Sequence, residues 1–438
     1  MSTREVPALT AARELTLPET AERTLSNGLT VIAAQRKAVP LVEVRLRIPF
    51  AQADVASGML MAETLLSGTS DMSNVELSAA LQAIGGQLSA GVDTDRLLLA
   101  GNALSTNLDR LLELLGTVLS DAAYPDDEVV AERERLADHV RVAKTQPSYL
   151  AREALNRRMY GSHPYAVQTA EPEQLLEVQT EVLRTLHADR VHPSGSTLII
   201  VGDGSPTDAL DAAEAALSTW NGGGKGIELP PVPSIPAGPV TLAHRPGSVQ
   251  SSLRLGLGAV GRTHPDHAAL QLANLVYGGY FSSRLVENIR EDKGYTYSPR
   301  SGVEHSEAGS AIVIAADVAT EVTAAALVEI WYELGRLVST PVSAEELLQA
   351  RQYGVGTLQL SVATQSGLAG LMSSLAAHGL RIDWLAGHAK RMSAATAEQV
   401  SEVASRYFAP SAAATVVLGD ATVVEPTLTR LFELQSTE

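Results

Sequence analysis

Cysteine is absent from this chain of 438 residues. Its absence excludes disulfide bonds, thiolate nucleophiles and metal sites built on sulfur ligands. Aromatic residues make up only 4% of the chain, so alanine, leucine and valine must fill most of the core, and a hydrophobic content of 45% is enough for that. No apolar run reaches the roughly 18–20 residues that a membrane-spanning helix needs, so we expect no contact with a membrane.

Basic residues are also scarce, because 33 lysines and arginines stand against 50 acidic residues and leave a net charge of −17. A surface of this sign argues against nucleic acid as a partner and would favour cationic peptides. The first 17 residues mix charges and proline and contain no apolar stretch of the kind found in secretory signals. We therefore expect a soluble, cytoplasmic protein.

The length of the chain predicts two domains of ordinary size. Residues 221–240 read NGGGKGIELPPVPSIPAGPV, and ten of these twenty residues are glycine or proline. Such a composition disfavours both helix and strand and indicates an interdomain linker. The sequence thus predicts an N-terminal domain over residues 1–220 and a C-terminal domain over residues 241–438.

The two predicted domains share an order of sequence features. Pro193 and Pro410 both precede an apolar strand, Gly202 and Gly419 both follow one, and each pair is separated by 217 residues. A constant offset of this kind indicates an internal duplication.

Each half begins and ends with predicted strands and has helices between them. Apolar and polar residues alternate over residues 42–48 and again over residues 253–257, a pattern typical of half-buried strands. This order favours an α+β domain, with a sheet covered by helices on one face, over a doubly wound parallel sheet. In the first half, helices are expected over residues 56–66, 74–84, 108–120, 126–144 and 171–189.

The most informative stretch is GGYFSSRLVENIREDKGYTYS, from Gly278 to Ser298. It predicts a two-glycine turn followed by a short amphipathic helix that Gly294 ends in the left-handed conformation. The apolar side of this helix would carry Leu285, Val286 and Ile289, and the opposite side Arg284, Glu287, Asn288 and Arg290.

Arg290 lies just before the predicted helix end and Tyr297 lies just after it. On local pattern alone, Arg290 is a solvated helix charge and Tyr297 a strand residue with a buried ring. The spacing also allows both side chains to project into one cleft.

This stretch resembles the C-terminal signature of the M16 metallopeptidases, the pitrilysin and mitochondrial processing peptidase superfamily. There, a turn of small residues precedes SSRL, a REK-like triplet, a glycine and a tyrosine. The resemblance covers nearly the whole chain and implies two homologous halves facing each other as a clamshell, each a mainly antiparallel sheet covered by helices on one face. It also implies that Arg290 and Tyr297, seven positions apart as in the family, bind the substrate peptide over a zinc site.

Catalytic members of that family carry H-x-x-E-H on their first long helix, with two zinc-binding histidines and a glutamate as general base. Alignment on Gly68-Thr69 puts Met59 and Glu63 at the histidine positions and Ala62 at the glutamate position. Because a thioether is a poor zinc ligand and alanine moves no proton, we expect no metal, no cofactor and no catalytic residue in this chain. Glu63 is then a hydrogen-bonded or salt-bridged helix residue.

The remaining candidates have structural readings. The family's third zinc ligand would fall within residues 132–141, where Asp138 and His139 lie near it. The pair His264 and His267 flanks a helix start that Asp266 is expected to cap. His163-Pro164-Tyr165 resembles a structural loop of the family.

The resemblance leads to the hypothesis that this chain is the zinc-free subunit of a heterodimeric M16-type peptidase. Its partner would be a subunit that carries H-x-x-E-H and the zinc ion, and this chain would contribute Arg290 and Tyr297 to hydrolysis of a peptide. The alternative is a structural or peptide-binding homologue without catalysis, like the core subunits of the respiratory bc1 complex. A pair that processes a ribosomally made peptide precursor is a refinement of the first hypothesis.

Overall fold

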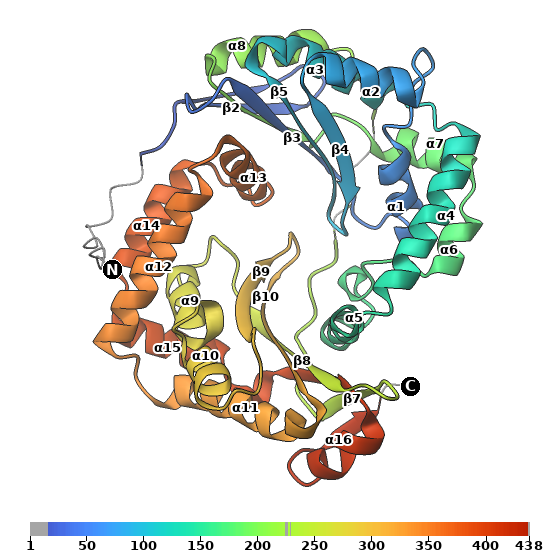
Figure 1. The fold of residues 1–438 in the computed structure, drawn as a ribbon. Coiled ribbons are helices and arrows are strands. Elements are labelled where there is room, and N and C mark those ends of the chain that lie inside the picture. The colour runs from blue at the N-terminus through green and yellow to red at the C-terminus, as the bar shows by residue number, and fades with distance from the viewer. Residues whose placement is uncertain (1–15, 224–226, 228, 437–438) are drawn as a thin grey trace, which may run out of the picture.

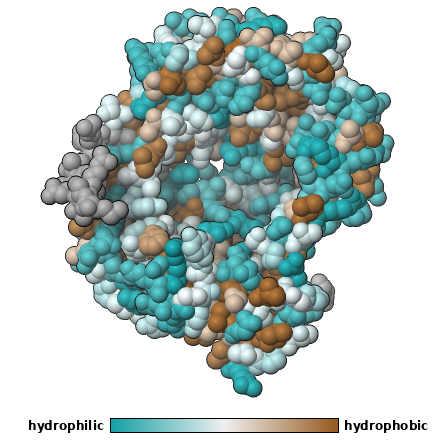
Figure 2. Space-filling model, in the orientation of Figure 1, coloured by the Kyte–Doolittle hydropathy of each residue, from teal (hydrophilic) through white to brown (hydrophobic). Residues whose placement is uncertain are grey.

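The computed structural model describes residues 16–223, 227 and 229–436. These residues form two halves, each built on a six-stranded sheet. Figure 1 shows the halves facing each other, the N-terminal half at the top and the C-terminal half below. Figure 2 shows a hollow between them whose visible wall is mainly hydrophilic. The predicted clamshell of two α+β halves is therefore confirmed.

The sheet of the N-terminal half has the strand order β1-β2-β6-β3-β5-β4. Its neighbours are antiparallel except β2 and β6, which are parallel. The strands are β1 Thr20–Thr24, β2 Thr30–Gln35, β3 Leu41–Pro49, β4 Gln87–Val92, β5 Arg96–Leu104 and β6 Thr197–Gly202.

Helices of the N-terminal half cover the outer face of this sheet and enclose a core with it. The fifth helix, α5, leaves this layer and extends towards the other half. The helices are α1 Val55–Thr64, α2 Asn74–Ala83, α3 Leu108–Asp121, α4 Asp126–Ala143, α5 Pro147–Tyr160, α6 Pro172–Glu177, α7 Thr180–Arg190 and α8 Pro206–Leu217.

The sheet of the C-terminal half has the order β12-β7-β11-β8-β10-β9. From β7 to β9 this order matches that from β2 to β4, which confirms that the two halves share one architecture. Only the pairs of β7 with β11 and β12 are parallel. The strands are β7 Val240–His244, β8 Gln250–Ala259, β9 Arg300–His305, β10 Ser310–Ala319, β11 Ala414–Gly419 and β12 Leu434–Ser436.

Helices of the C-terminal half again cover the outer face of their sheet, and α13 is the one that reaches the other half. Two of the segments, η3 and η4, are π-helical. The helices are α9 His267–Asn274, η3 Leu275–Gly279, α10 Arg284–Val286, η4 Glu287–Asp292, α11 Thr323–Ser339, α12 Ala344–Ser361, α13 Gln365–Ala376, α14 Asp383–Ala394, α15 Ala397–Tyr407 and α16 Ala421–Leu428.

Residues 221–223, 227 and 229–239 contain neither helix nor strand, and β7 begins at Val240. Residues 224–226 and 228 of the predicted linker lie outside the described residues. Pro230 is tied to the N-terminal half, because its carbonyl oxygen lies 2.9 Å from Nε2 of His163. This part of the connection thus lies against the loop after α5.

One expected helix is divided in two. Residues 171–189 were predicted as one continuous helix, but α6 ends at Glu177 and α7 begins at Thr180. Val178 is extended and buried, and its carbonyl oxygen accepts a hydrogen bond from Arg133 on α4. The tertiary contact with α4 therefore replaces a backbone bond that a continuous helix would have made.

The side chains of the alternating strands lie on the two sheet faces that the sequence pattern predicts. On β3, Val42, Val44 and Leu46 enter the core of the N-terminal half. On the opposite face, Arg45 donates to the carbonyl oxygens of Val44 and Gly101 at 2.8 and 3.3 Å.

The corresponding arginine of the other half repeats this arrangement. Arg254 on β8 donates to the carbonyl oxygens of Leu253 and Ala316 at 2.9 and 3.2 Å. The duplication therefore extends to individual side-chain contacts on the inner faces of the sheets.

Each half also places one helix on the inner face of the other half's sheet. Leu368, Met372 and Leu375 of α13 pack in one cluster with Ile199 and Val201 of β6. This docking is fixed at its start by Gln365, whose side-chain amide donates to backbone carbonyls in and beside the β2–β3 turn at 2.9–3.2 Å.

The reciprocal contact is made by α5. Leu155 and Met159 pack against Val313 of β10 and Val416 of β11. Gly256 of β8 leaves room for Met159, because a Cβ atom at this position would overlap the Met159 sulfur. The inner face of each sheet is thus partly covered by a helix of the opposite half.

No helix among the described residues combines the length and the apolar character that crossing a membrane requires.

We predict that Met159→Ala lowers the free energy of unfolding by about 2–5 kcal/mol, because the truncation leaves a cavity between α5 and the opposite sheet. Urea denaturation measures the change. Leu348→Ala, on an exposed position of α12, is the matched control and should change stability far less. An equal effect of both substitutions would show that α5 contributes no packing across the two halves.

Candidate functional site

The helix α1 contains Met59, Ala62 and Glu63, the residues that align with the family's zinc motif. Asp54 caps its start by accepting hydrogen bonds from the Ser57 amide and hydroxyl at 2.9 and 2.6 Å. Leu60 and Met61 are fully buried and anchor the helix to the core. Met59 is partly accessible and Glu63, one helical turn later, is exposed.

Glu63 is held by an ion pair with Arg135 of α4, with 2.9 Å between the nearest oxygen and nitrogen atoms. Arg135 also pairs with Glu132 at 2.6 Å, and its guanidinium lies 3.3 Å from Nδ1 of His139. The carboxylates of Glu132 and Glu63 raise the pKa of Arg135. Glu63 is therefore the salt-bridged helix residue that the sequence predicted.

The donor set around α1 does not fit the zinc ion of the family. A permanent cation, Arg135, pairs with Glu63, and Asp138 pairs with Arg141 at 2.6 Å. Within the part of the chain that the structure describes, no three histidine, aspartate or glutamate side chains are grouped so as to hold a metal ion.

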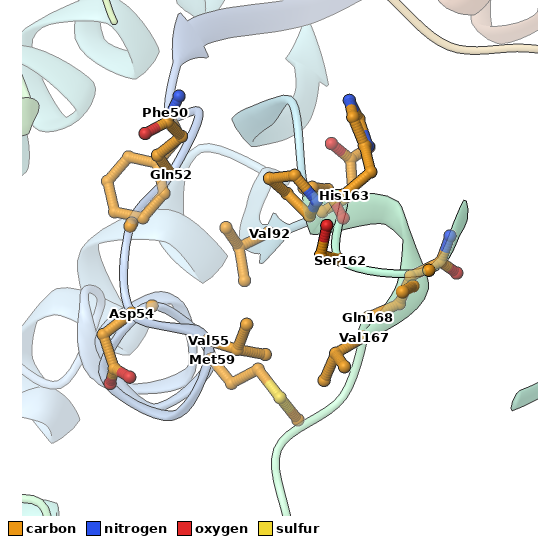
Figure 3. A pocket seen from close by; sticks show the side chains of 17 residues that line it. Phe50, Gln52, Asp54, Val55, Met59, Val92, Ser162, His163, Val167 and Gln168 are labelled. Atoms are coloured by element: carbon orange, nitrogen blue, oxygen red, sulfur yellow. The ribbon is translucent and has the colours of Figure 1, made fainter. Parts of the chain in front are cut away.

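Met59 lines a cavity of about 290 Å³ beside α1, and its sulfur accepts a hydrogen bond from the Ala170 amide at 3.4 Å. Figure 3 shows Met59 and Val55 of α1 facing Val167 across this cavity, with Val92 of β4 above them. Met59, at a predicted histidine position of the family motif, is therefore part of the wall of this cavity.

The second candidate site lies on the C-terminal half, at the end of η4. The guanidinium carbon of Arg290 lies 4.6 Å from the ring centroid of Tyr297 and 4.6 Å from that of Phe281. Both aromatic residues are exposed, Tyr297 by 79% and Phe281 by 60%. The structure therefore brings Arg290 and Tyr297 together in a stack, with the Tyr297 ring at the surface and not buried.

Phe281 was missed by the sequence analysis. The sequence feature that could have revealed it is a large apolar residue among glycines and serines, because such a segment offers few apolar contacts that could bury the ring. Two flanking rings restrict the guanidinium to one plane and attract its charge. Arg290 also forms an ion pair with Glu291 at 3.1 Å, which leaves part of its donor set directed to solvent.

Two details of this stretch differ from the prediction. Gly278 and Gly279 end the π-helical segment η3 instead of forming a separate turn, and the following helix changes from α to π after Val286. Gly294 does adopt the left-handed conformation, with φ of 63°. A π-helical insertion reorients the side chains that follow it, and such insertions are frequent at functional sites.

Arg284 and Asn288 were expected on the solvent side but are buried. Arg284 donates to both carboxylate oxygens of Glu346 on α12 at 2.6 and 3.0 Å. Burial alone would raise the pKa of Glu346, but the bonds from Arg284 and Ser343 lower it to about 2. Glu346 lies 62 residues after Arg284 in the sequence, and its two hydrogen bonds fix the segment that precedes Arg290.

The Arg290 stack and α1 lie far apart within the chain. Thr296 bonds the Asp317 carbonyl near one end of the β9–β10 hairpin, at 2.7 Å. The tip of the hairpin, at the other end, contacts the N-terminal half: the amides of Glu307 and Ala308 donate to Asp95 and to the Tyr165 hydroxyl at 3.1 and 3.0 Å. A strand the length of β9 spans about 20 Å, so the stack does not face the chain's own α1.

The pair His264 and His267 has a structural role. Asp266 does not cap α9 as predicted, because its carboxylate binds Arg406 and Tyr407 at 2.5 and 2.9 Å. His267 is only 1% exposed and lies 5.0 Å, between ring centroids, from both His305 and His388.

Burial keeps these rings neutral, and neighbouring histidines add to the effect. Together they lower the pKa of His267 to about 2 and that of His305 to about 3. For His388, burial and the nearby cations Arg391 and Arg262 lower the pKa to about 4. The cluster is therefore uncharged wherever the protein is folded near neutral pH.

Comparison with known proteins agrees with this geometry. Residues 59–173 match the family model described as insulinase, peptidase family M16, and residues 177–353 match the model described as peptidase M16 inactive domain. The chain belongs to the M16 peptidase family. The lack of H-x-x-E-H in the sequence and the Glu63–Arg135 ion pair are consistent with a non-catalytic member.

Among its relatives are uncharacterized zinc proteases of Mycobacterium leprae and Bacillus subtilis. Both are 24% identical to this chain and cover 67% of it, over 68% and 71% of their own lengths. Subunit 1 of the mitochondrial cytochrome b-c1 complex of Bos taurus is 21% identical over 64% of this chain and 62% of its own length.

Two solved structures have the same fold. A peptidase M16 inactive domain from Pseudomonas fluorescens superposes with a TM-score of 0.84 at 21% identity, over 92% of this chain and 98% of its own. A protease from Helicobacter pylori gives a TM-score of 0.84 at 19% identity, over 92% and 100%.

We predict that two histidines alone do not restore zinc binding on α1. The double variant Met59→His/Glu63→His should retain no stoichiometric zinc after dialysis, because Arg135 repels the ion and holds the nearby Glu132 carboxylate in an ion pair. Adding Arg135→Glu should give retention, measured by elemental analysis. Arg141→Glu in the same double variant is the control, and zinc retained equally by the double and triple variants would contradict this account.

We predict that stability falls as the pH drops from 6.5 towards 4. The unfolded chain binds protons on its histidines below their ordinary pKa of 6.5, whereas His267, His305 and His388 stay neutral in the folded state until lower pH. His267→Phe removes one of these groups and should flatten the loss, as urea denaturation at several pH values would measure. His264→Gln, in an exposed turn, is the control, and equal slopes for His267→Phe and the wild type would refute the prediction.

Proposed function

We propose that this chain is the zinc-free subunit of a heterodimeric M16-type peptidase. One observation carries the proposal: Arg290 contacts the exposed ring of Tyr297, while Glu63 in the aligned zinc motif is held in an ion pair. The partner would be a catalytic M16 subunit that carries H-x-x-E-H and binds zinc. The substrate would be a peptide that both subunits contact.

The chemistry of the stack suits an electrophilic role at a peptide bond. Guanidinium N–H groups and the Tyr297 hydroxyl are donors that can bind substrate carbonyls or the oxyanion that forms during hydrolysis. Phe281 and Tyr297 hold the guanidinium in place before substrate arrives, so little ordering is needed at the moment of reaction. This chain would therefore stabilise charge and position the peptide, without moving a proton to water itself.

The distance between the stack and α1 supports action in trans. The β9–β10 hairpin separates Arg290 from the chain's own N-terminal half, as described above. A zinc ion next to Arg290 must then come from another polypeptide that docks on this face. Exposed Phe281 and Tyr297 offer apolar surface for such a contact.

A peptide would bind in extended form, as an added strand along a sheet edge inside the clamp. We propose the cytoplasm as the location of the pair, in line with the expectation from the sequence. Maturation of a precursor peptide and general peptide degradation are both compatible with this chemistry.

The alternative is a structural or peptide-binding homologue without catalysis. Similarity to a subunit of the cytochrome b-c1 complex favours it. The Arg290 stack favours the peptidase, because a structural subunit has no need of a cation held against two exposed aromatic rings. Hydrolysis by the purified pair, and by neither chain alone, distinguishes the two.

We predict that Arg290→Ala lowers kcat of the reconstituted pair on the order of 10²–10³-fold, because one oxyanion donor is lost. Tyr297→Phe keeps the stack and removes only the hydroxyl, so its effect should be smaller. Arg430→Ala, an exposed arginine after α16, is the control. Unchanged hydrolysis with Arg290→Ala would reject the shared-site proposal.

A further inference from the structure

A second cavity, with a volume of about 300 Å³, lies among the helices of the C-terminal half. Helices α9, α12 and α14 surround it, next to strand β9 (Figure 1). Its volume is at the lower limit of the roughly 300–1,000 Å³ that is typical of pockets for small molecules. It shares no lining residue with the cavity beside α1 and none with the Arg290 stack. A ligand in this cavity would therefore occupy a site of its own.

Arg262 contributes a cation to the wall of this cavity. Among the described residues, its guanidinium makes one hydrogen bond, to the Ser374 hydroxyl at 3.4 Å, and no ion pair, and its Nε atom is buried without a partner. The buried Arg284, by contrast, is paired with Glu346. Because a partly buried cation without a counter-ion is costly, an anion that binds here explains Arg262 better than packing does.

The surroundings of Arg262 are positive. Within the part of the chain that the structure describes, no aspartate or glutamate lines the cavity. Burial, followed by the charge of Arg262, lowers the pKa of His305 to about 3 and also lowers the pKa of His378. Burial lowers the pKa of Arg262 itself, and no carboxylate of the described segments counteracts this shift. In a chain with a net charge of −17, the cavity is therefore a local positive region that attracts an anion.

Gln271 adds a neutral donor to the same wall. Its side-chain oxygen accepts a hydrogen bond from Nε2 of His388 at 2.5 Å, which fixes the orientation of the amide group. The amide nitrogen makes no hydrogen bond within the described ranges, so it remains a donor for a ligand. The hydroxyls of Thr357 and Ser361 are already used, because both donate to backbone carbonyls of α12. The available polar groups, Arg262 and Gln271, are thus donors, and they select an acceptor.

Apolar side chains form most of the remaining wall, among them Leu275, Leu358, Leu385 and Trp384. The ring of Trp384 is stacked on that of His388, with 4.4 Å between the centroids and 11° between the planes. This stack presents a flat surface beside the cation. Such a combination suits a ligand that has an apolar body and a single anionic end.

The donor set indicates a carboxylate as the anionic end. The planar guanidinium of Arg262 offers two parallel N–H groups, which match the two oxygens of a carboxylate. One arginine also balances one negative charge. A phosphate dianion would leave a second charge uncompensated next to the apolar wall, at a high cost in desolvation.

We propose that this cavity binds a small organic acid, with its carboxylate on Arg262 and Gln271 and its apolar body against Trp384. A free small molecule and the C-terminal residue of a short peptide both present this chemistry, and the test separates them. The site does not depend on the proposed peptidase function, because it lies within this chain and needs no partner subunit.

The test is isothermal titration calorimetry of the purified full chain with two pairs of probes. Phenylpropionate and phenylpropionamide represent the free small molecule, and the peptide Gly-Ser-Gly-Phe with a free or an amidated C-terminus represents the chain end. In at least one pair the acid should bind on the order of tenfold tighter than its amide, because only the acid forms charge-assisted hydrogen bonds. A preference in the first pair alone identifies a free acid as the ligand, and a preference in the second pair identifies a chain end.

Variants locate this preference. Arg262→Gln removes the charge and should reduce the ratio between the affinities of acid and amide to about one. Its free energy of unfolding, measured in urea, should not fall, because no ion pair within the described residues is lost. Arg430→Gln, at an exposed arginine after α16, is the matched control and should keep the ratio.

A second variant tests the cavity with Arg262 in place. Thr357 is exposed on α12 and lines the cavity, so Thr357→Trp should fill the space without disturbing the core and should abolish binding of the preferred acid. This variant decides the question if Arg262→Gln does not fold.

Four results would overturn the proposal. They are the lack of binding of either acid at millimolar concentration, equal binding of acid and amide in both pairs, an unchanged ratio in Arg262→Gln, and undiminished acid binding in Thr357→Trp. Hydrolysis by the reconstituted pair is measured separately, so the failure of one proposal leaves the other standing.

Discussion

The exchange of helices between the two halves is the contact on which the rest of the structure depends. Each sheet has apolar residues on its inner face as well as its outer face, and water would otherwise reach the inner ones. The helices α13 and α5 cover them reciprocally, and Gly256 makes the space into which Met159 fits. Because each half completes the core of the other, their relative position is fixed, and the hollow between them keeps a defined shape.

The β9–β10 hairpin adds a polar connection inside that hollow. Its tip binds Asp95 and Tyr165, and Arg47 and Arg152 pair with Glu307 and Glu304. These contacts join the tip to the edge of the opposite sheet, while the other end of the hairpin lies by the Arg290 stack. The hairpin thus separates the two candidate sites, and each site has different surroundings. This separation underlies the proposal that a second subunit completes the catalytic site.

The positive charge of Arg135 beside α1, more than the absence of single ligands, distinguishes this helix from a metal site. Met59 and Glu63 could in principle be replaced by better ligands, but Arg135 places a permanent positive charge beside them. The same region gains an apolar cavity at Met59. The helix α1 is thus a packed element whose exposed carboxylate is neutralised by an ion pair.

The sequence by itself determined the features that depend on neighbours along the chain. Gly294 as a left-handed helix end and the alternating residues of β3 both follow from local backbone and side-chain preferences. The spacing of Arg290 and Tyr297 also allowed the contact that the structure shows between their side chains. The tertiary structure alone decided the burial of Arg284 by Glu346, the stacking of Phe281 on Arg290, the break after Glu177 and the exchange of α5 and α13. A periodic pattern specifies which side of an element is apolar, but the partner that covers that side comes from distant sequence and is chosen by packing in three dimensions.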